Sequence, residues 1–462
     1  MTDRAPEFTD LPLNPALFQG LDALGHVQMT PIQAQSLPAL LEGRDLIAQA
    51  PTGSGKTAAF GLALLQRIDM AQGRTQALVL CPTRELADQV AKQIRKLATG
   101  IANLKLQTLT GGMALGPQLA SLEQHAPHVV VGTPGRVQEL LRKKVLDLRV
   151  VRVVVLDEAD RMLDMGFEEP IREIVGRTPK ERQTLLFSAT YPDAIRDIAR
   201  TLMREPLEVT VEGATRQADI DQRFYEVDPA QKPAALAGLL MEHNPESAVV
   251  FCNMRRDTEE VVSSLAHLGF SALPLHGDME QRDRDEVLVR FANRSCNVLV
   301  ASDVAARGLD IDDLAAVINY ELPHDADTYV HRIGRTARAG RSGLALSLVT
   351  PRELPRVQML EEKLGAPIRL QRAPLAALRA RSAPAAATVT LRIDAGKTDK
   401  LRPGDIVGAL TGDAGLPVAA VGKIDVFPTR SYVAIARAHA DKALSQLQAG
   451  KIKGRKFRVR RI

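Results

Sequence analysis

Short runs of Val, Leu and Ile recur along the first 370 residues, and amphipathic segments with a helical pattern separate them. The apolar runs are continuous rather than alternating, which is typical of parallel strands that are buried on both faces. They read RDLIAQ, ALVLC, HVVVG, RVVVLD and TLLFS in the first half, and AVVFC, ALPLH, NVLVA, AVINY and ALSLV in the second. The pattern therefore predicts two α/β lobes, each a doubly wound parallel sheet, of similar size.

Two segments interrupt this pattern. Residues 213–219 are small and polar and predict a hinge, and residues 371–387 are rich in Ala, Pro and Arg and predict a linker. The block at 388–462 reads strand, helix, strand, strand, helix, strand, which is the ferredoxin-like order of an RNA-recognition module. The expected domains are thus a first lobe at 1–212, a second lobe at 220–370 and an α+β domain after the linker.

Composition supports an ordered, multidomain protein. The chain has 462 residues, of which 45% are hydrophobic and 25% charged, and it has no Trp. Cys81, Cys252 and Cys296 are an odd number of widely spaced thiols, which argues against a disulfide framework or a zinc site. The N-terminus has acids and prolines where a signal peptide has a basic start and an apolar run, so we expect a cytoplasmic protein with no membrane segment.

Charge is unevenly distributed. Residues 388–462 contain 15 Lys or Arg and six Asp, a net +9, so the preceding residues carry −4 of the total of +5. This asymmetry favours a surface that contacts nucleic acid, although a merely solvated basic face is the alternative.

The stretch APTGSGKT is the first candidate for chemistry. It lies between an apolar run and a helical pattern, so it predicts a loop that places an anion at a helix N-terminus. Gly53 and Gly55 would let backbone N–H groups converge on phosphates, Lys56 would reach the outer phosphates, and Thr57 would offer its hydroxyl to Mg²⁺. A glycine-rich turn is the alternative. The predicted nucleotide contacts in the loop are Ala50, Pro51, Thr52, Gly53, Ser54, Gly55, Lys56 and Thr57.

An acidic pair follows a later apolar run. The run RVVVLDEAD ends in Asp157 and Glu158, and the carboxyl ends of strands are where open α/β sheets bind ligands. Asp157 suits Mg²⁺ and Glu158 suits polarising the attacking water, whereas a plain acidic surface turn is the alternative.

At the letters DEAD the chain resembles the DEAD-box RNA helicases of superfamily 2, over residues 8 to about 370. The resemblance implies two RecA-like lobes, ATP and Mg²⁺ as cofactors, and RNA-dependent hydrolysis of ATP to ADP and phosphate. It also implies that Phe8 stacks on adenine and that Gln33 reads the adenine edge. His26 and Met29 depart from the family, which usually has an aromatic residue and a proline there.

Further motifs match the family in order. Read physically, they are loops with small residues, hydroxyls and arginines, which suit phosphates rather than bases, and each alone would be a plain helix cap. The resemblance implies RNA contacts at Pro82, Thr83, Arg84, Gly111, Gly112, Thr133, Gly135, Arg136, Gln281, Arg284, Arg307 and Gly308. The resemblance also implies that Asp310 contacts the ribose of ATP. It implies coupling between ATP state and RNA at Asp160, Ser188, Thr190, His331 and Arg332.

The segment HRIGRTARAG completes the catalytic set. Its arginines 332, 335 and 338 recur every three residues, which predicts one shared face of a helix; a solvated arginine face is the alternative. By resemblance, Arg335 and Arg338 neutralise charge on the transferring phosphoryl group together with Lys56, Asp157 and Glu158. Ala337 stands where many family members have glycine. Because the set is split between lobes, ATP and RNA should bind with positive coupling.

The last block resembles the C-terminal domain of the bacterial DbpA subfamily, from RPGDIVGALTGDAGL to GKIKGRKFRVRR. This implies recognition of a hairpin in 23S ribosomal RNA during large-subunit assembly. We also expect the protein to be a monomer. Its central strands offer only Phe427 and Tyr432 for base stacking. Phosphate attraction is expected instead from Lys451, Lys453, Arg455, Lys456 and Arg458. The alternatives are a general RNA helicase or chaperone, a DNA helicase, and an ATP-gated RNA-binding scaffold.

Overall fold

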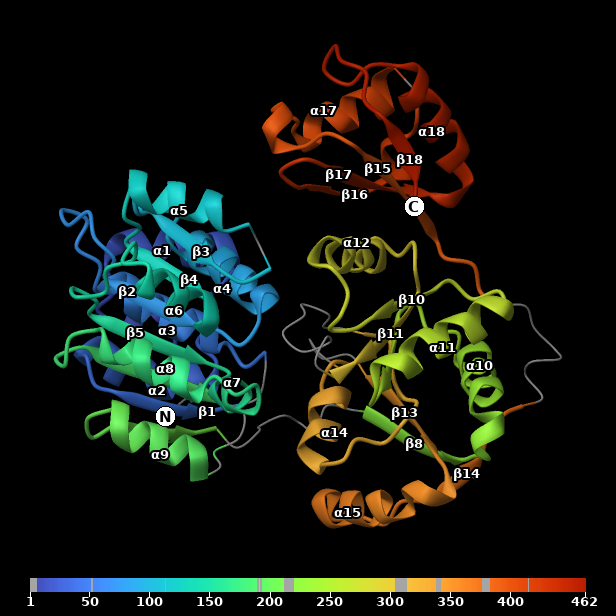
Figure 1. Ribbon diagram of the computed structural model, residues 1–462, viewed down its shortest axis with the longest axis horizontal. Helices are drawn as coiled ribbons and strands as arrows, with labels where there is room; N and C mark the ends of the chain where they lie inside the picture. Colours follow the sequence, from blue (N-terminus) through green and yellow to red (C-terminus); the bar gives the residue numbers. More distant parts are fainter. Residues whose placement is uncertain are drawn as a thin grey trace. The chain divides into compact units, whose positions relative to one another are not determined.

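The computed structural model describes residues 6–50, 53–112, 114–188, 191, 193–211, 220–303, 314–337, 342–375, 383–413 and 415–462. The chain divides near residue 217 into two compact units, of which the second contains both the second lobe and the C-terminal domain. Figure 1 colours the chain from blue to red along the sequence. Within the described part of the chain, no helix is both long and apolar enough to cross a membrane.

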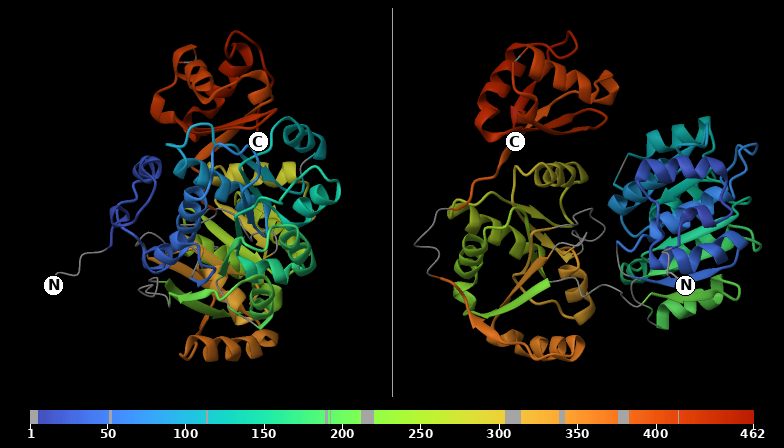
Figure 2. Two further views of the ribbon diagram at one scale, coloured as in Figure 1. Left: turned by 90° about the vertical axis from the view of Figure 1, so that its left-hand side faces the viewer. Right: turned by 180° about the vertical axis from the view of Figure 1, so that it is seen from behind.

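The first lobe is a parallel sheet of seven strands in the order β3-β4-β2-β5-β6-β1-β7. Helices cover both faces, as the opposite views in Figures 1 and 2 show. One face buries a core around Phe60 and Phe187, whose ring centroids lie 5.2 Å apart, and the other buries Met162 and Ile174. The strands are β1 Leu46–Gln49, β2 Ala77–Leu80, β3 Leu106–Leu109, β4 Val129–Gly132, β5 Val153–Asp157, β6 Gln183–Ser188 and β7 Leu207–Thr210. The helices are α1 Pro15–Leu24, α2 Pro31–Glu42, α3 Lys56–Gln66, α4 Arg84–Leu97, α5 Leu115–Gln124, α6 Pro134–Arg142, α7 Ala159–Asp164, α8 Glu168–Gly176 and α9 Asp193–Leu202.

The second lobe repeats this architecture, with the parallel order β10-β11-β9-β12-β13-β8-β14. Its strands are β8 Ile220–Glu226, β9 Ala248–Cys252, β10 Ala272–Leu275, β11 Val298–Ser302, β12 Ala316–Asn319, β13 Gly343–Val349 and β14 Leu370–Arg372. Its helices include α10 Lys232–His243, α11 Arg255–His267, α12 Gln281–Ala292, α14 Ala326–Ile333 and α15 Leu354–Leu364. Strand β14 pairs with β8, so the sheet continues into the segment predicted as a linker.

The C-terminal domain has a four-stranded antiparallel sheet in the order β16-β17-β15-β18. Leu391, Ile406 and Ile435 are fully buried in its core. The elements are β15 Thr388–Ile393, α17 Pro403–Gly408, β16 Val421–Val426, β17 Ser431–Ala436, α18 Ala440–Ala449 and β18 Val459–Arg461. The predicted fold class, two doubly wound lobes and a small α+β domain, is confirmed.

One face of this sheet contacts helix α12 of the second lobe and the turn that follows the helix. Glu286 accepts hydrogen bonds from Arg392 Nη1 at 3.1 Å and from the Tyr432 hydroxyl at 3.2 Å. Thr390 bonds the Ser295 hydroxyl at 2.7 Å, and Arg430 donates to the Arg282 carbonyl at 3.1 Å. Tyr432 is therefore fully buried, so its ring is not available for stacking on a base.

We expect Glu286→Gln to weaken this contact by about 2 kcal/mol, because Arg392, which is largely buried, loses its charged partner on α12. Hydrogen–deuterium exchange of the β15 amides in the full chain measures the effect as loss of protection. Asp283→Asn on the exposed side of the same helix is the matched control and should leave exchange unchanged. Equal protection in both variants would show that the ion pair does not hold the domain.

Candidate functional site

The glycine loop between β1 and α3 is held by a side chain from α2. Gly55 is the N-cap of α3 with φ 97°, a left-handed conformation that favours glycine. A Cβ atom there would lie 2.5 Å from Gln33 Nε2. Gln33 Nε2 donates to the Gly55 carbonyl at 3.0 Å, and Gln33 Oε1 accepts from the Thr30 N–H at 2.8 Å. Gln33 thus fixes the loop itself. Pro51 and Thr52 lie outside the described residues.

Phe8, predicted to stack on adenine, packs in the core of the first lobe. The residue is only 2% exposed, and its ring centroid lies 6.4 Å from that of His26. The adenine contact stays a prediction.

Lys56 and Asp157 are both buried at the carboxyl ends of β1 and β5. Lys56 Nζ donates to the Ala50 carbonyl at 2.8 Å. Burial raises the pKa of Asp157 to about 7, although nearby Lys56 opposes the shift. A cation bound beside this carboxylate would favour its ionised form. The described residues contain no cluster of three or more His, Cys, Asp or Glu able to hold a metal.

Glu158 is positioned by its backbone and by one arginine. It is the N-cap of α7 with φ 51° and ψ 54°, a conformation uncommon for a residue with a side chain. Arg161 Nη1 donates to Glu158 Oε2 at 2.5 Å, and both side chains are largely buried. The neighbouring Cys81 thiol has a pKa well above its usual value, because the thiol is fully buried and the negative charges of Asp157 and Glu158 disfavour a thiolate.

A hydrogen bond joins the DEAD segment, residues 157–160, to Ser188 at the end of β6. The Asp160 N–H donates to Ser188 Oγ at 3.3 Å. Both residues are among those to which the resemblance assigns coupling between ATP state and RNA, and that coupling stays a prediction. Thr190, the other predicted coupling residue here, lies outside the described residues.

The predicted RNA contacts of the first lobe gather at the carboxyl ends of three neighbouring strands, β3, β4 and β2. Thr133 Oγ1 accepts from the Gly111 N–H at 3.3 Å, which joins the loops that follow β4 and β3. Thr83 caps α4 by accepting from the Leu86 N–H at 3.3 Å. Pro82 and Gly112 lie in these loops, and Gly135 lies in the first turn of α6. Arg84 and Arg136 lie near acids of their own helices, Asp88 at 3.9 Å and Glu139 at 3.1 Å.

In the second lobe, α12 carries the predicted RNA contacts at its N-terminal end. Gln281 is its first residue and donates to Asp285 Oδ1 at 2.9 Å, and Arg284 lies in the same turn. The same helix contacts the C-terminal domain through Glu286. Arg307, Gly308 and Asp310 lie outside the described residues.

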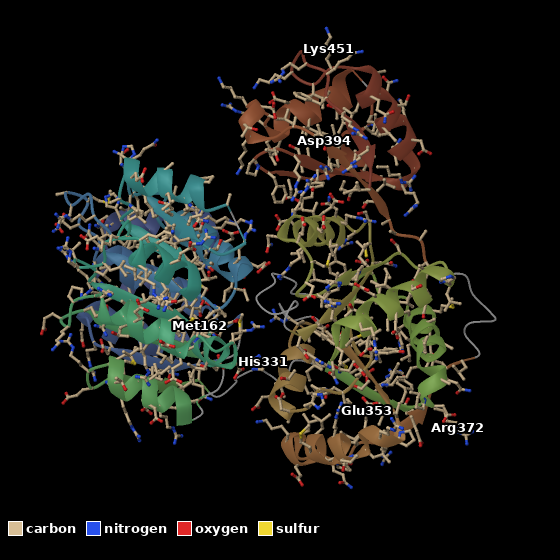
Figure 3. All side chains as sticks on the ribbon, viewed as in Figure 1. Met162, His331, Glu353, Arg372, Asp394 and Lys451 are labelled. Atoms are coloured by element: carbon tan, nitrogen blue, oxygen red, sulfur yellow. The ribbon has the colours of Figure 1, made fainter. Side chains whose placement is uncertain are left out.

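The predicted common face of three arginines is wrong. Helix α14 ends at Ile333, so Arg335 lies in the turn that follows it, and Arg338 is outside the described residues. Arg332 is only 2% exposed and donates to both carboxylate oxygens of Asp303 at 2.7 Å. It anchors the lobe internally, whereas its neighbour His331, labelled in Figure 3, is exposed.

Sequence reasoning missed the partners of Arg332. Its guanidinium also donates to Asn319 Oδ1 at 3.0 Å, Asn253 Oδ1 at 2.9 Å and the Glu321 carbonyl at 2.7 Å. Asn253 directly follows the buried strand β9, and Asn319 ends β12. A polar residue at the carboxyl end of each buried strand was the available signal.

Five basic residues near the end of the chain were predicted to attract RNA phosphates. Two of them, Lys453 and Arg455, also contact the loop at residues 399–405. Lys453 Nζ donates to the Lys400 carbonyl at 2.8 Å and lies 3.6 Å from Asp405, and Arg455 lies 3.5 Å from Asp399. Residues 397–405 and 451–458 therefore form one surface, here called the basic end. Its exposed cations are Lys397, Lys400, Arg402, Lys451, Lys453, Arg455, Lys456 and Arg458. The first three were not singled out in the sequence, and Figure 3 labels Lys451.

Family models match three parts of the chain: DEAD/DEAH box helicase at 30–198, helicase conserved C-terminal domain at 231–340, and DbpA RNA binding domain at 390–461. The chain is 52% identical over 452 residues to the ATP-dependent RNA helicase DbpA of Escherichia coli K12, covering 97% of each. It is 44% identical over 355 residues to the DEAD-box ATP-dependent RNA helicase CshA of Bacillus anthracis, covering 77% of this chain and 67% of that one. Among solved structures, Saccharomyces cerevisiae Dbp5 bound to RNA and ADP BeF3 matches with a TM-score of 0.72 and 31% identity, over 80% of this chain and 96% of that one.

Proposed function

We propose, from the premise that this chain belongs to the DEAD-box ATP-dependent RNA helicases of the DbpA subfamily, that its C-terminal domain directs it to a hairpin of 23S ribosomal RNA. The chain is an RNA-dependent ATPase and helicase. The proposal adds that it acts in the cytoplasm, as a monomer, on precursors of the large ribosomal subunit. The observation that carries the proposal is the match of the DbpA RNA binding domain over residues 390–461.

The chemistry of hydrolysis falls to the loops of the first lobe and to Arg335 and Arg338 of the second. Lys56 stabilises the outer phosphates of ATP, and Glu158 orients and polarises the attacking water. Thr57 and Asp157 would hold Mg²⁺, which supplies charge neutralisation between the phosphates when bound. Because both arginines belong to a different lobe from the glycine loop, turnover depends on lobe closure, which bound RNA favours.

The basic end is the surface we assign to ribosomal RNA. The face of the sheet that carries Tyr432 is buried against α12, so base stacking there is excluded while the domain is docked. The basic end instead presents eight exposed cations beside two partly buried acids, Asp399 and Asp405. Such a surface binds RNA phosphates and shape, with bases read from loops of the hairpin.

We expect Lys451→Ala with Lys456→Ala to weaken activation by ribosomal RNA. Each lysine lost from a phosphate contact should lower the slope of log affinity against log salt by about 1. Steady-state ATP hydrolysis, titrated with 23S ribosomal RNA at several salt concentrations, measures both effects. The control is Lys423→Ala with Lys442→Ala, which removes the same charge from β16 and α18 and should leave activation intact.

The same assay separates the targeted helicase from a general one. If 23S ribosomal RNA activates hydrolysis far more than an unrelated RNA of equal length, and the Lys451 and Lys456 variant loses that preference, the targeting proposal holds. Equal activation by both RNAs would overturn it and leave a general RNA helicase. That alternative draws support from the scarcity of exposed aromatic rings in the C-terminal domain.

A further inference from the structure

The turn that joins β16 to β17 ends at Arg430 and packs on the basic end. Lys397 donates its backbone N–H to the Phe427 carbonyl at 2.9 Å. Thr398 donates its backbone N–H to the Pro428 carbonyl, also at 2.9 Å. These hydrogen bonds fix the turn to a loop of the basic end, so the Arg430 side chain starts from a fixed backbone.

The Arg430 side chain is itself confined. Its guanidinium carbon lies 5.7 Å from the ring centroid of Phe427 and 5.8 Å from that of Tyr432. The two rings meet edge to face, with their centroids 5.6 Å apart. Arg430 is only 8% exposed, and a guanidinium this close to aromatic rings is attracted to them more strongly when water is excluded. The guanidinium is therefore held in one place.

From that place the guanidinium contacts the first turns of α12. Arg430 Nη2 donates to the Arg282 carbonyl at 3.1 Å and lies 3.6 Å from Asp285 Oδ2. The other oxygen of this carboxylate, Oδ1, accepts a hydrogen bond from Gln281 Nε2 at 2.9 Å. Because both oxygens belong to one rigid group, the carboxylate cannot turn away from Arg430 and keep the same geometry to Gln281. Asp285 thus joins an arginine of the C-terminal domain to a glutamine that the sequence assigns to RNA.

We propose that Arg430 is a positioning residue for RNA binding by the second lobe: it holds Asp285, which in turn fixes the amide of Gln281 for RNA. The inference rests on the proposed RNA contact of Gln281. Ordering a glutamine side chain during binding costs conformational entropy, and a carboxylate that already holds the amide removes part of that cost. The C-terminal domain thereby raises the affinity of the second lobe even for RNA that the domain itself does not recognise.

Arg430→Met removes the guanidinium and keeps an unbranched side chain. In this variant of the full chain, we expect the half-activating concentration of poly(U) in steady-state ATP hydrolysis to rise about three- to tenfold, the usual effect of one hydrogen bond on an equilibrium constant. The kcat at saturating poly(U) should stay within about twofold, because other groups perform hydrolysis. Arg437→Met is the matched control, since this exposed arginine of the same domain donates to the Ala386 carbonyl and not to α12. It should change neither value.

Combination with Gln281→Ala separates positioning from general support by the domain. Gln281→Ala alone should raise the half-activating concentration. Arg430→Met in that background should add nothing, because the amide that Arg430 positions is absent. The same fold-change for Arg430→Met with and without the Gln281 substitution would overturn the inference, and so would an unchanged half-activating concentration in Arg430→Met alone.

The same variants show which assignment is at fault. If Gln281→Ala leaves activation by poly(U) unchanged, the RNA contact of Gln281 is wrong and the inference falls with it. Targeting to 23S ribosomal RNA is judged in the unmodified chain, and its failure leaves the poly(U) results standing. Should Arg430→Met unfold the C-terminal domain, as loss of hydrogen–deuterium exchange protection throughout the domain would show, Asp285→Asn tests the same link from α12. Asparagine can still accept from Gln281 but has no charge to attract Arg430, so the same rise is expected, and an unchanged value would overturn the inference.

Discussion

Glu158→Gln is expected to abolish ATP turnover, with kcat falling about 10²- to 10⁴-fold, while ATP and RNA still bind. Glutamine has the shape of glutamate, and the left-handed backbone at this position is unchanged by the substitution. The Arg161 guanidinium, 2.5 Å from the carboxylate, can still donate to the amide oxygen. What glutamine lacks is the negative charge that polarises the attacking water.

Steady-state hydrolysis with saturating RNA measures the loss, and titration with a fluorescent nucleotide measures binding. Glu173→Gln is a matched control, because Glu173 also pairs with one arginine, Arg142 at 2.6 Å, but on the surface of α8. It should hydrolyse ATP normally. Normal turnover in Glu158→Gln would show that the assignment of Glu158 is wrong. Loss of nucleotide binding as well as turnover would show that the carboxylate holds the site together rather than acting on water.

Arg332→Met is expected to destabilise the second lobe by about 3–5 kcal/mol, the usual effect of removing one partner of a buried ion pair. The guanidinium makes hydrogen bonds to Asp303, Asn319, Asn253 and the Glu321 carbonyl, and it stacks 5.0 Å from the centroid of Phe251. Methionine fills similar volume and satisfies none of these polar groups. Asp303 would keep its charge beside a side chain that cannot neutralise it.

Hydrogen–deuterium exchange of β11 and β12 in the full chain reports this loss, since the two lobes need not unfold together. Arg332→Lys keeps the charge but cannot bind Asp303 through two nitrogens, so an intermediate loss is expected. Arg352→Met, at an exposed position before α15, should change exchange little. A loss below about 1 kcal/mol in Arg332→Met would mean that the network is no more than a set of weak surface pairs.

The buried position of Arg332 changes how its predicted coupling role is to be understood. Its buried side chain joins the ends of β9, β11 and β12 to α14. Any influence on ATP or RNA would therefore pass through the shape of these loops.

The sequence by itself determined the features that depend on neighbours along the chain. Continuous apolar runs marked parallel strands, because a strand buried on both faces has no polar positions to alternate. The glycine loop was readable because phosphate binding needs left-handed backbone and a following helix, and Gly53 and Gly55 both have positive φ. The order of elements in the C-terminal domain followed from the same local patterns.

Only the tertiary structure decided which partner each polar side chain meets. The three-residue spacing of arginines predicts one face only while the helix continues. The partners of Arg332 lie 29 and 13 residues away, at Asp303 and Asn319. Glu286 and Tyr432 are 146 residues apart in the sequence, so no local pattern could predict that α12 covers this face of the C-terminal sheet. Periodicity reports that a position is buried, but the free energy of an ion pair depends on groups that folding alone brings together.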